Sequence, residues 1–294
     1  MQLSRYLGFV VLGVLASSTA VAGSGRDFQA LQSAASKGDA AAQLALAGAY
    51  MFGDGIVRDE AAALKWYRAA ADQGSPDAQM SLGMIYAGGE GVAKDEQEAA
   101  KWFRLAGEQG LVEAQAMLAG IYATGKGVPQ DDKEAVKWLR LAAAKGDAAS
   151  QNNLGWMCAN GRGTAMAPKE AAKWYRLAAD QGFAAAQLTV GQMYSAGFTV
   201  AKDDKEAARW YRLAADQGLP QAHLTLGQVY EKGLGVPQDL RAAYVEYSLA
   251  AADGSDGSDA AAKERDRLAK KLPAADLQAA RAKTTQNVAK AGGK

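Results

Sequence analysis

Apolar residues along the chain recur at spacings of three and four, which places them on one face of an α-helix. The segment that begins at Pro76 carries such a stripe, formed by Ala78, Leu82, Ile85 and Tyr86. The stripe predicts a helix of about a dozen residues, which ends in a glycine-rich turn. We call this first helix of the pattern helix A.

A second helix, helix B, is predicted directly after the turn. The turn GEGV covers residues 89–92, and its glycines permit the positive φ that a tight reversal needs. Asp95, followed three residues later by Glu98, has the capping-box pattern that starts a helix, and Gly110 ends that helix. The same acidic pair recurs at residues 131 and 134 and at residues 203 and 206.

The pattern of two helices repeats along most of the chain. The segment AAKWYRLAADQG at residues 171–182 returns as AARWYRLAADQG at residues 207–218. Tryptophans stand at an unbroken spacing of 36 residues, at Trp66, Trp102, Trp138, Trp174 and Trp210. Short helix pairs are marginally stable alone, so such repeats stabilise one another by stacking, with the tryptophans filling the gaps between units. The sequence predicts an all-α fold of stacked 36-residue helix-turn-helix repeats.

The motifs L-G-x-x-Y, G-x-G-V, an acidic cap and W-Y-R-x-A-A-D-Q-G resemble the Sel-1-like repeat family, a relative of the tetratricopeptide repeats. Six matching units cover residues 39–254, with a capping helix before them in residues 23–38 and a helical cap and tail after them in residues 255–294. The resemblance implies a right-handed α-solenoid that binds a protein or peptide partner, often in bacterial envelope regulation or host contact.

The N-terminal segment has the layout of a secretory signal peptide. Residues 1–22 contain one positive charge at Arg5, an apolar run, and an A-x-A cleavage site that ends at Ala22. The alternative, an uncleaved membrane anchor, fits less well because the apolar run is shorter than the roughly 20 residues that cross a bilayer. We therefore expect a periplasmic or secreted protein with no integral membrane span after cleavage.

The charge of the chain bears on its possible partners, and its cysteine content bears on whether disulfide bonds stabilise it. The chain has 33 basic and 32 acidic residues, and loss of Arg5 with the signal would leave 32 of each. This balance gives no overall positive field for nucleic acid, so none is expected as a partner. Cys158 is the only cysteine, which rules out an intramolecular disulfide.

No motif in the sequence predicts a catalytic residue, a metal ion or a cofactor. His223, the only histidine, occupies a helix A position where the other units have glutamine, and one histidine with one cysteine cannot form a His/Cys zinc site. The G-x-G turns lack the Gly-Lys-Ser/Thr ending of a phosphate loop. An alternative function is an envelope-directed enzyme that binds or hydrolyses β-lactams, as attributed to cysteine-rich relatives, but the cysteine pairs of those relatives are absent here.

Candidate partner-binding residues are predicted on helix A, on the side opposite the packing stripe. They are Met80, Met84, Met117, Asn152, Asn153, Trp156, Gln192 and Gln228. We place the centre of the groove at Asn152, Asn153 and Trp156, because amides can pair with a peptide backbone and an aromatic ring provides contact area. The alternative is that Trp156 folds over the space left by Cys158, which replaces the tyrosine of other units.

A secondary contact is predicted at the turns, because Phe198 and Leu234 are apolar where the four earlier turns carry charge. Ordinary surface exposure is the alternative for these two residues.

The signal-peptide interpretation predicts the N-terminus of the mature protein. Cleavage after Ala22 should leave Gly23 as the first residue, and osmotic shock should release the protein without detergent. N-terminal sequencing of the released protein measures this directly. Recovery in the membrane fraction with Met1 retained would contradict the interpretation.

Overall fold

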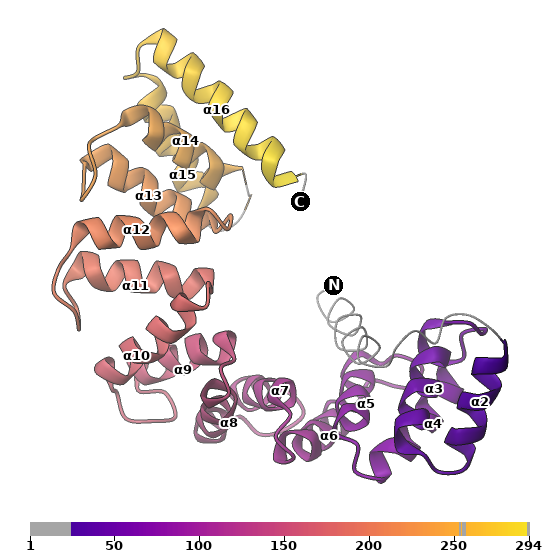
Figure 1. Cartoon of the computed structure of the whole chain (residues 1–294). Coiled ribbons are helices and arrows are strands. Elements are labelled where there is room, and N and C mark those ends of the chain that lie inside the picture. Colours follow the sequence, from indigo (N-terminus) through magenta and orange to yellow (C-terminus); the bar gives the residue numbers. More distant parts are fainter. Residues whose placement is uncertain (1–24, 253, 255–256, 293–294) are drawn as a thin grey trace. The chain divides into compact units, whose positions relative to one another are not determined.

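A computed structural model describes residues 25–252, 254 and 257–292, and all regular structure in these residues is α-helical (Figure 1). The chain forms two compact units, Met1–Lys145 and Gly146–Lys294. The predicted signal segment, residues 1–22, and the predicted mature N-terminus at Gly23 lie outside the described residues.

Each unit is a series of antiparallel helices joined by short turns. The helices of the first unit are α2 (Gly25–Ser36), α3 (Ala40–Phe52), α4 (Glu60–Asp72), α5 (Pro76–Gly88), α6 (Glu96–Glu108), α7 (Val112–Thr124) and α8 (Asp132–Ala144). Those of the second unit are α9 (Ala148–Asn160), α10 (Pro168–Asp180), α11 (Ala184–Ala196), α12 (Asp204–Ala215), α13 (Pro220–Lys232), α14 (Leu240–Ala251), α15 (Ser258–Ala269) and α16 (Ala274–Gly292). The prediction of an all-α solenoid of 36-residue helix-turn-helix repeats is confirmed, with α3 and α4 as the first pair; its right-handed sense stays a prediction.

Acidic residues start most of the B helices, as the capping pattern predicts. The Asp95 carboxylate accepts hydrogen bonds from the backbone N–H groups of Gln97 at 3.0 Å and Glu98 at 2.9 Å. The Glu98 carboxylate instead pairs with Lys101 at 2.8 Å, so only the aspartate half of the capping box is present. In α10 the capping position is Ala167, which provides no side-chain hydrogen bond.

A ring lying on a glycine joins helix A to helix B in most of the repeats. A Cβ atom added to Gly83 in α5 would lie 2.5 Å from the ring of Phe103 in α6. The same substitution at Gly191 or Gly227 would bring the Cβ within 2.6 Å of a tyrosine ring on the paired helix. In the second repeat the ring is more deeply buried than the neighbouring tryptophan: Phe103 is 2 % exposed, whereas Trp102 is half-buried. In the third and fifth repeats Trp138 and Trp210 are themselves buried.

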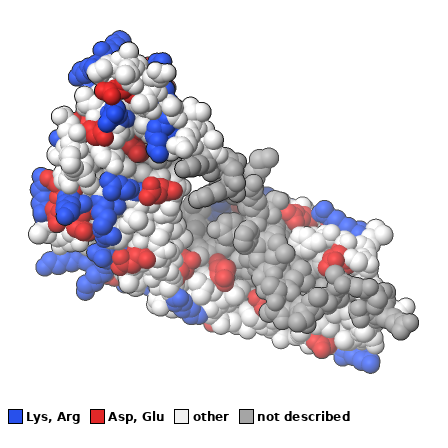
Figure 2. Space-filling view, turned by 45° about the horizontal axis from the view of Figure 1, so that its top comes forward, with Lys and Arg blue, Asp and Glu red and all other residues white. Residues whose placement is uncertain are grey.

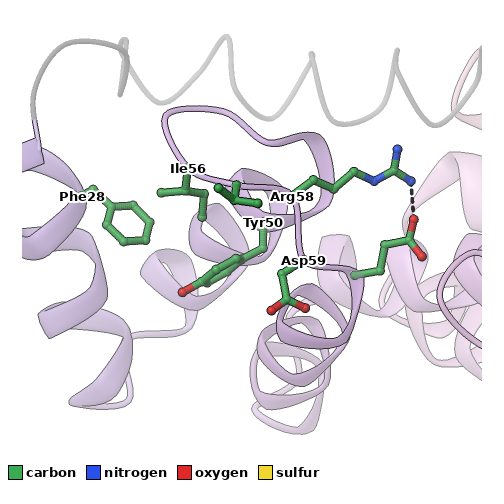
Figure 3. A pocket seen from close by; sticks show the side chains of 7 residues that line it. Phe28, Tyr50, Ile56, Arg58 and Asp59 are labelled. Atoms are coloured by element: carbon green, nitrogen blue, oxygen red, sulfur yellow. Dashed lines mark hydrogen bonds and ion pairs between the residues drawn. The ribbon is translucent and has the colours of Figure 1, made fainter.

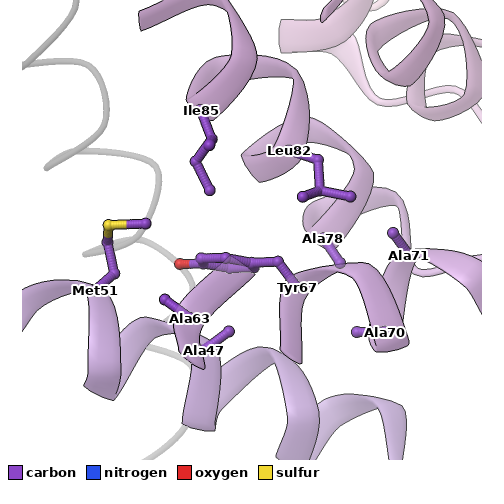
Figure 4. Packing of buried hydrophobic residues seen from close by; sticks show 9 residues of the cluster. All are labelled: Ala47, Met51, Ala63, Tyr67, Ala70, Ala71, Ala78, Leu82 and Ile85. Atoms are coloured by element: carbon purple, nitrogen blue, oxygen red, sulfur yellow. The ribbon is translucent and has the colours of Figure 1, made fainter. Parts of the chain in front are cut away.

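The core of the first unit shows how small residues surround such a ring. Tyr67 is buried in a cluster with Met51, Leu82 and Ile85, and alanines from α3, α4 and α5 complete the cluster (Figure 4). The alanines shorten the distance between helix axes, so that one tyrosine reaches all three helices. Burial raises the pKa of the Tyr67 hydroxyl well above its usual value, which keeps it neutral.

Buried glutamines link consecutive repeats. In α5, Gln79 donates a hydrogen bond from Nε2 to the carbonyl oxygen of Ala71 at 3.2 Å and accepts one at Oε1 from Gln109 at 2.8 Å. Gln43 and Gln187 make the same two bonds with their own neighbours. In the third repeat Lys145 stands where a donor glutamine is expected and bonds to the Gly110 carbonyl oxygen instead. Oε1 of Gln115 is consequently buried with no hydrogen-bond partner in the described chain.

The last two helices pack against the end of the second unit. Pro273 separates α15 from α16, and Leu268 and Ala280 join the buried cluster of α14. Arg267 of α15 also contacts Glu231 of α13, with Nη2 2.6 and 2.7 Å from the two carboxylate oxygens. The buried Tyr247 donates a hydrogen bond to the same carboxylate at 3.0 Å. Apolar packing and a hydrogen-bonded ion pair together hold the C-terminal helices on the repeats.

Replacement of Trp138 tests the packing of the repeats. Trp138 is 3 % exposed, so Trp138→Ala should lower the free energy of unfolding by about 3–5 kcal/mol. Leu141 in the same helix is 43 % exposed, and Leu141→Ala is the matched control that should have a much smaller effect. Denaturant unfolding followed by circular dichroism measures both variants. Equal stabilities of Trp138→Ala and the wild type would contradict the packing described.

The Glu231 carboxylate makes the docking of the C-terminal helices dependent on pH. Burial raises its pKa, but the hydrogen bonds from Arg267 and Tyr247 and the charge of Arg267 outweigh burial, so the pKa lies below the ordinary value of 4.5. A lowered pKa stabilises the folded state above the ordinary value, and this stabilisation is lost as the pH falls through the pKa of the folded state.

We expect the protection of α15 amides against hydrogen exchange, corrected for the intrinsic pH dependence of exchange, to fall below about pH 4.5 more than that of α12 amides. Glu231→Gln should remove this difference in pH dependence while leaving the α12 profile unchanged. An identical pH profile for α15 in the wild type and in Glu231→Gln would show that the carboxylate does not control docking.

Candidate partner-binding face

Helix α9 carries the side chains that the sequence places at the centre of a groove. Asn152 and Trp156 are four residues apart and therefore lie on one face of the helix, with Asn153 beside them. Asn153 is exposed and Asn152 half-buried, with the Asn152 amide 3.4 Å from the Asn153 side-chain oxygen. The Trp156 ring is 45 % exposed, and the Arg162 guanidinium lies 5.7 Å from its centroid. This face combines amides, an indole ring and a cation.

The exposure of Trp156 bears on the two interpretations of this residue. Cys158 is completely buried two residues further along the helix. Residues two apart on a helix do not face each other, so the indole ring is directed away from the core that contains the thiol. This exposure favours the surface interpretation of Trp156 over the alternative in which it fills the space left by Cys158.

The same face continues on α11 and α13, the next two A helices of the second unit. Gln192 and Gln228 stand 36 and 72 residues after Trp156, and both are exposed. Thr189 and Thr225, on the flank, donate hydroxyl hydrogen bonds to carbonyl oxygens of their own helices at 3.0 and 2.8 Å. The side-chain amides of the two glutamines have no hydrogen-bond partner among the described residues. They are available to a partner's backbone.

In the first unit the predicted groove residues are not equally exposed. Met80 and Met84 are 1 % and 2 % exposed, so their prediction as surface residues is wrong. The physical reason is that α5 is covered on all sides: every residue from 78 to 85 is buried, including the polar Gln79 and Ser81. Met117 of α7 is half-buried. The predicted face of the A helices is therefore polar and exposed on the second unit.

The turns of the second unit expose apolar side chains at the predicted positions. Phe198 is 58 % exposed and Leu234 is 37 % exposed. Thr199, next to Phe198, has φ = 66° and is the only non-glycine residue of the described chain with positive φ. A β-branched residue is strained in this conformation, and glycine occupies the equivalent position in the other turns. A role for Phe198 and Leu234 in binding stays a prediction.

On the surface in view in Figure 2, charge does not mark out a patch for a macromolecular partner. Figure 2 shows basic and acidic side chains interspersed over the surface in view. Among the described residues, no three His, Cys, Asp or Glu side chains are arranged to hold a metal ion. Within the same residues no helix has the length and apolar character needed to span a membrane.

Sequence reasoning missed a ladder of arginine–tyrosine pairs that connects consecutive repeats. Each pair joins a B-helix arginine to the tyrosine hydroxyl 18 residues later: Arg68 to Tyr86, Arg104 to Tyr122, Arg176 to Tyr194 and Arg212 to Tyr230. The Arg104 guanidinium also lies 5.6 Å from the ring centroid of Tyr122, and the Arg212 guanidinium lies 5.9 Å from that of Tyr230. The constant spacing was visible in the sequence and could have revealed the ladder.

A second missed contact joins two residues that depart from the repeat pattern. His223 replaces the buried glutamine and Glu246 replaces the tryptophan of the other units. Their side chains meet, with His223 Nδ1 2.6 Å from Glu246 Oε2. The two replacements therefore compensate each other in the last repeat.

Six consecutive segments match the Sel1 repeat: residues 40–75, 76–111, 112–147, 148–183, 184–219 and 220–255. The chain belongs to the Sel1 repeat family. The matched units begin one residue later than the predicted limits of 39–254, and together they cover most of the chain. A search for similar curated proteins finds no match.

Solved Sel1 repeat structures resemble this Sel1 repeat protein over most of its length. A Sel1 repeat protein from Oxalobacter formigenes is 31 % identical, with a TM-score of 0.70, over 90 % of this chain and 76 % of the other. A protective antigen of uropathogenic Escherichia coli strains, described as displaying an SLR fold, is 27 % identical, with a TM-score of 0.53, over 89 % of this chain and 71 % of the antigen.

Proposed function

We propose that this Sel1 repeat protein is a periplasmic or secreted scaffold that binds an extended peptide or a partner protein on the A helices of its second unit. The face formed by Asn152, Asn153, Trp156, Gln192 and Gln228 is the proposed contact surface. The observation that carries the proposal is the 45 % exposure of Trp156 beside side-chain amides.

The chemistry of this face suits a polypeptide. Side-chain amides donate and accept hydrogen bonds and can therefore pair with both groups of a peptide backbone. An exposed indole ring provides contact area at low entropic cost, and tryptophan and arginine are enriched among the residues that dominate binding energy. The five side chains that form the proposed contact surface are uncharged, which favours contacts with the backbone and apolar side chains of a partner over ion pairing.

The biological setting that we propose is bacterial envelope regulation or contact with a host. The signal-like residues 1–22 and the similarity to a protective antigen support this setting.

Two variants on α9 test the binding face. The partner is first captured from envelope extract, identified by mass spectrometry and purified. Trp156→Ala and Asn152→Ala should then each weaken binding by about 1–3 kcal/mol in titration calorimetry, because each removes a direct contact. Asn152→Ala should leave the melting temperature almost unchanged, since the side chain is outside the core.

The matched control is Leu177→Ala on α10, whose side chain is 47 % exposed, close to the exposure of Trp156. This variant should bind with wild-type affinity. Unaltered affinity in both α9 variants would rule out the proposed face, and equal weakening by Leu177→Ala would show that the effect is not specific to it.

A further inference from the structure

The first tyrosine of the ladder has no arginine. Counting back 18 residues from Tyr50 leads to Gln32 in α2, an exposed residue. In the described chain the Tyr50 hydroxyl makes no hydrogen bond, and the ring has an edge-on contact with Phe28 at 6.1 Å between centroids. Tyr50 is thus the start of a ladder whose first partner is missing.

Helix α2 nevertheless occupies the place of a preceding B helix. Gln43 donates to the carbonyl oxygen of Ala35 in α2 at 3.0 Å, just as Gln79 donates to Ala71 in α4 at 3.2 Å. The backbone of this end is therefore built like an interface between repeats. Among the side chains that differ from those of a B helix, Gln32 stands where the ladder arginine would contact Tyr50.

A hollow of about 650 Å³ lies beside the uncovered tyrosine. Phe28, Tyr50, Ile56 and Val57 form its apolar part, and Arg58, Asp59 and Glu60 line its polar part. Figure 3 shows the Tyr50 ring between Phe28 and Asp59, with Ile56 above it. Val57 is 88 % exposed.

The polar part of the hollow favours a cation. The backbone N–H of Asp59 donates to the Tyr50 carbonyl oxygen at 3.0 Å, which keeps the aspartate beside the tyrosine. One Asp59 carboxylate oxygen accepts from the Ala62 N–H at 2.9 Å, and the carboxylate is exposed. Arg58 does not occupy the position of the missing ladder arginine beside Tyr50, because its guanidinium pairs with Glu60 and points away from Tyr50 (Figure 3).

We propose that this hollow binds an arginine-bearing segment of a partner polypeptide, whose guanidinium takes the place of the missing ladder arginine on Tyr50. The guanidinium would lie over the tyrosine ring, donate to its hydroxyl and face the Asp59 carboxylate. An apolar side chain next to the arginine would pack on Phe28, Ile56 and Val57. This site belongs to the first unit and does not depend on the face proposed on α9, α11 and α13.

Three short peptides serve as probes of the guanidinium: acetyl-Leu-Arg-Leu-amide, its lysine analogue and its citrulline analogue. Citrulline keeps the planar shape of arginine but has no charge, and lysine keeps the charge without the planar fork. Binding is followed by NMR through the backbone amides of Ile56, Val57 and Arg58 in the purified protein. We expect the arginine peptide to bind at least about tenfold more tightly than either analogue.

Two variants test the replacement of the ladder arginine. Gln32→Arg supplies an arginine from α2 at the ladder spacing, so it should raise the melting temperature and weaken the arginine peptide about tenfold or more. Tyr50→Phe removes only the hydroxyl and should weaken the peptide several-fold. Because that hydroxyl has no partner among the described residues, Tyr50→Phe should melt at the wild-type temperature. Gln32→Ala is the matched control and should bind like the wild type.

The proposal is overturned if the arginine peptide causes no shifts at residues 56–58, or if the citrulline peptide binds equally well. Wild-type peptide affinity in Gln32→Arg would likewise show that the hollow does not take a ladder arginine. Failure of these tests would leave the α9 face unaffected, because its test uses variants and a partner that are separate from the hollow.

Discussion

The close approach of helix A to helix B is the constraint on which the repeat depends. A ring from helix B lies where a Cβ atom of helix A would otherwise be, at Gly83, Gly155, Gly191 and Gly227. Because the helices are this close, small side chains must line the rest of the contact, which explains the many buried alanines. The buried glutamines and the arginine–tyrosine pairs can then form hydrogen bonds with the next repeat. Residues outside these contacts are free to vary, and the candidate binding surfaces are found among them.

Periodicity made most of the fold predictable from the sequence. The start of α6 after Asp95 follows from an acidic cap that recurs at fixed spacing, and a proline, Pro76, marks the start of α5. Exposure was harder to predict, because one helix does not reveal how many sides its neighbours cover. Met84 and Trp156 occupy equivalent positions, yet one is buried and the other is largely exposed. The hollow beside Tyr50 was missed because it depends on the absence of an arginine from α2. That absence is recognised only once the 18-residue spacing of the ladder is known.

The two proposed sites arise from departures at places where the repeat pattern is otherwise regular. On α9, an asparagine pair and a tryptophan create an exposed surface with both amide and aromatic character. At α2, a glutamine in place of the ladder arginine leaves a tyrosine uncovered. Other departures are compensated within the molecule, as His223 and Glu246 show by pairing at 2.6 Å. A departure from the repeat pattern that has no compensating contact within the molecule is therefore the better indicator of a binding site.

The third repeat departs at the ring contact itself, with Ala119 at the glycine position and Leu139 at the ring position. A methyl group on helix A leaves less room, and leucine is narrower than tyrosine. During folding, B helices with nearly identical sequences could dock on the wrong A helix, because one register of the chain resembles the next. Leu139 docked on a glycine helix would leave a void, whereas a tyrosine ring can pack on an alanine at this position, as Tyr67 does beside Ala47 in the first repeat. Leu139 thus disfavours docking of its own helix on the glycine helices of other repeats, in an array whose units are otherwise close to interchangeable.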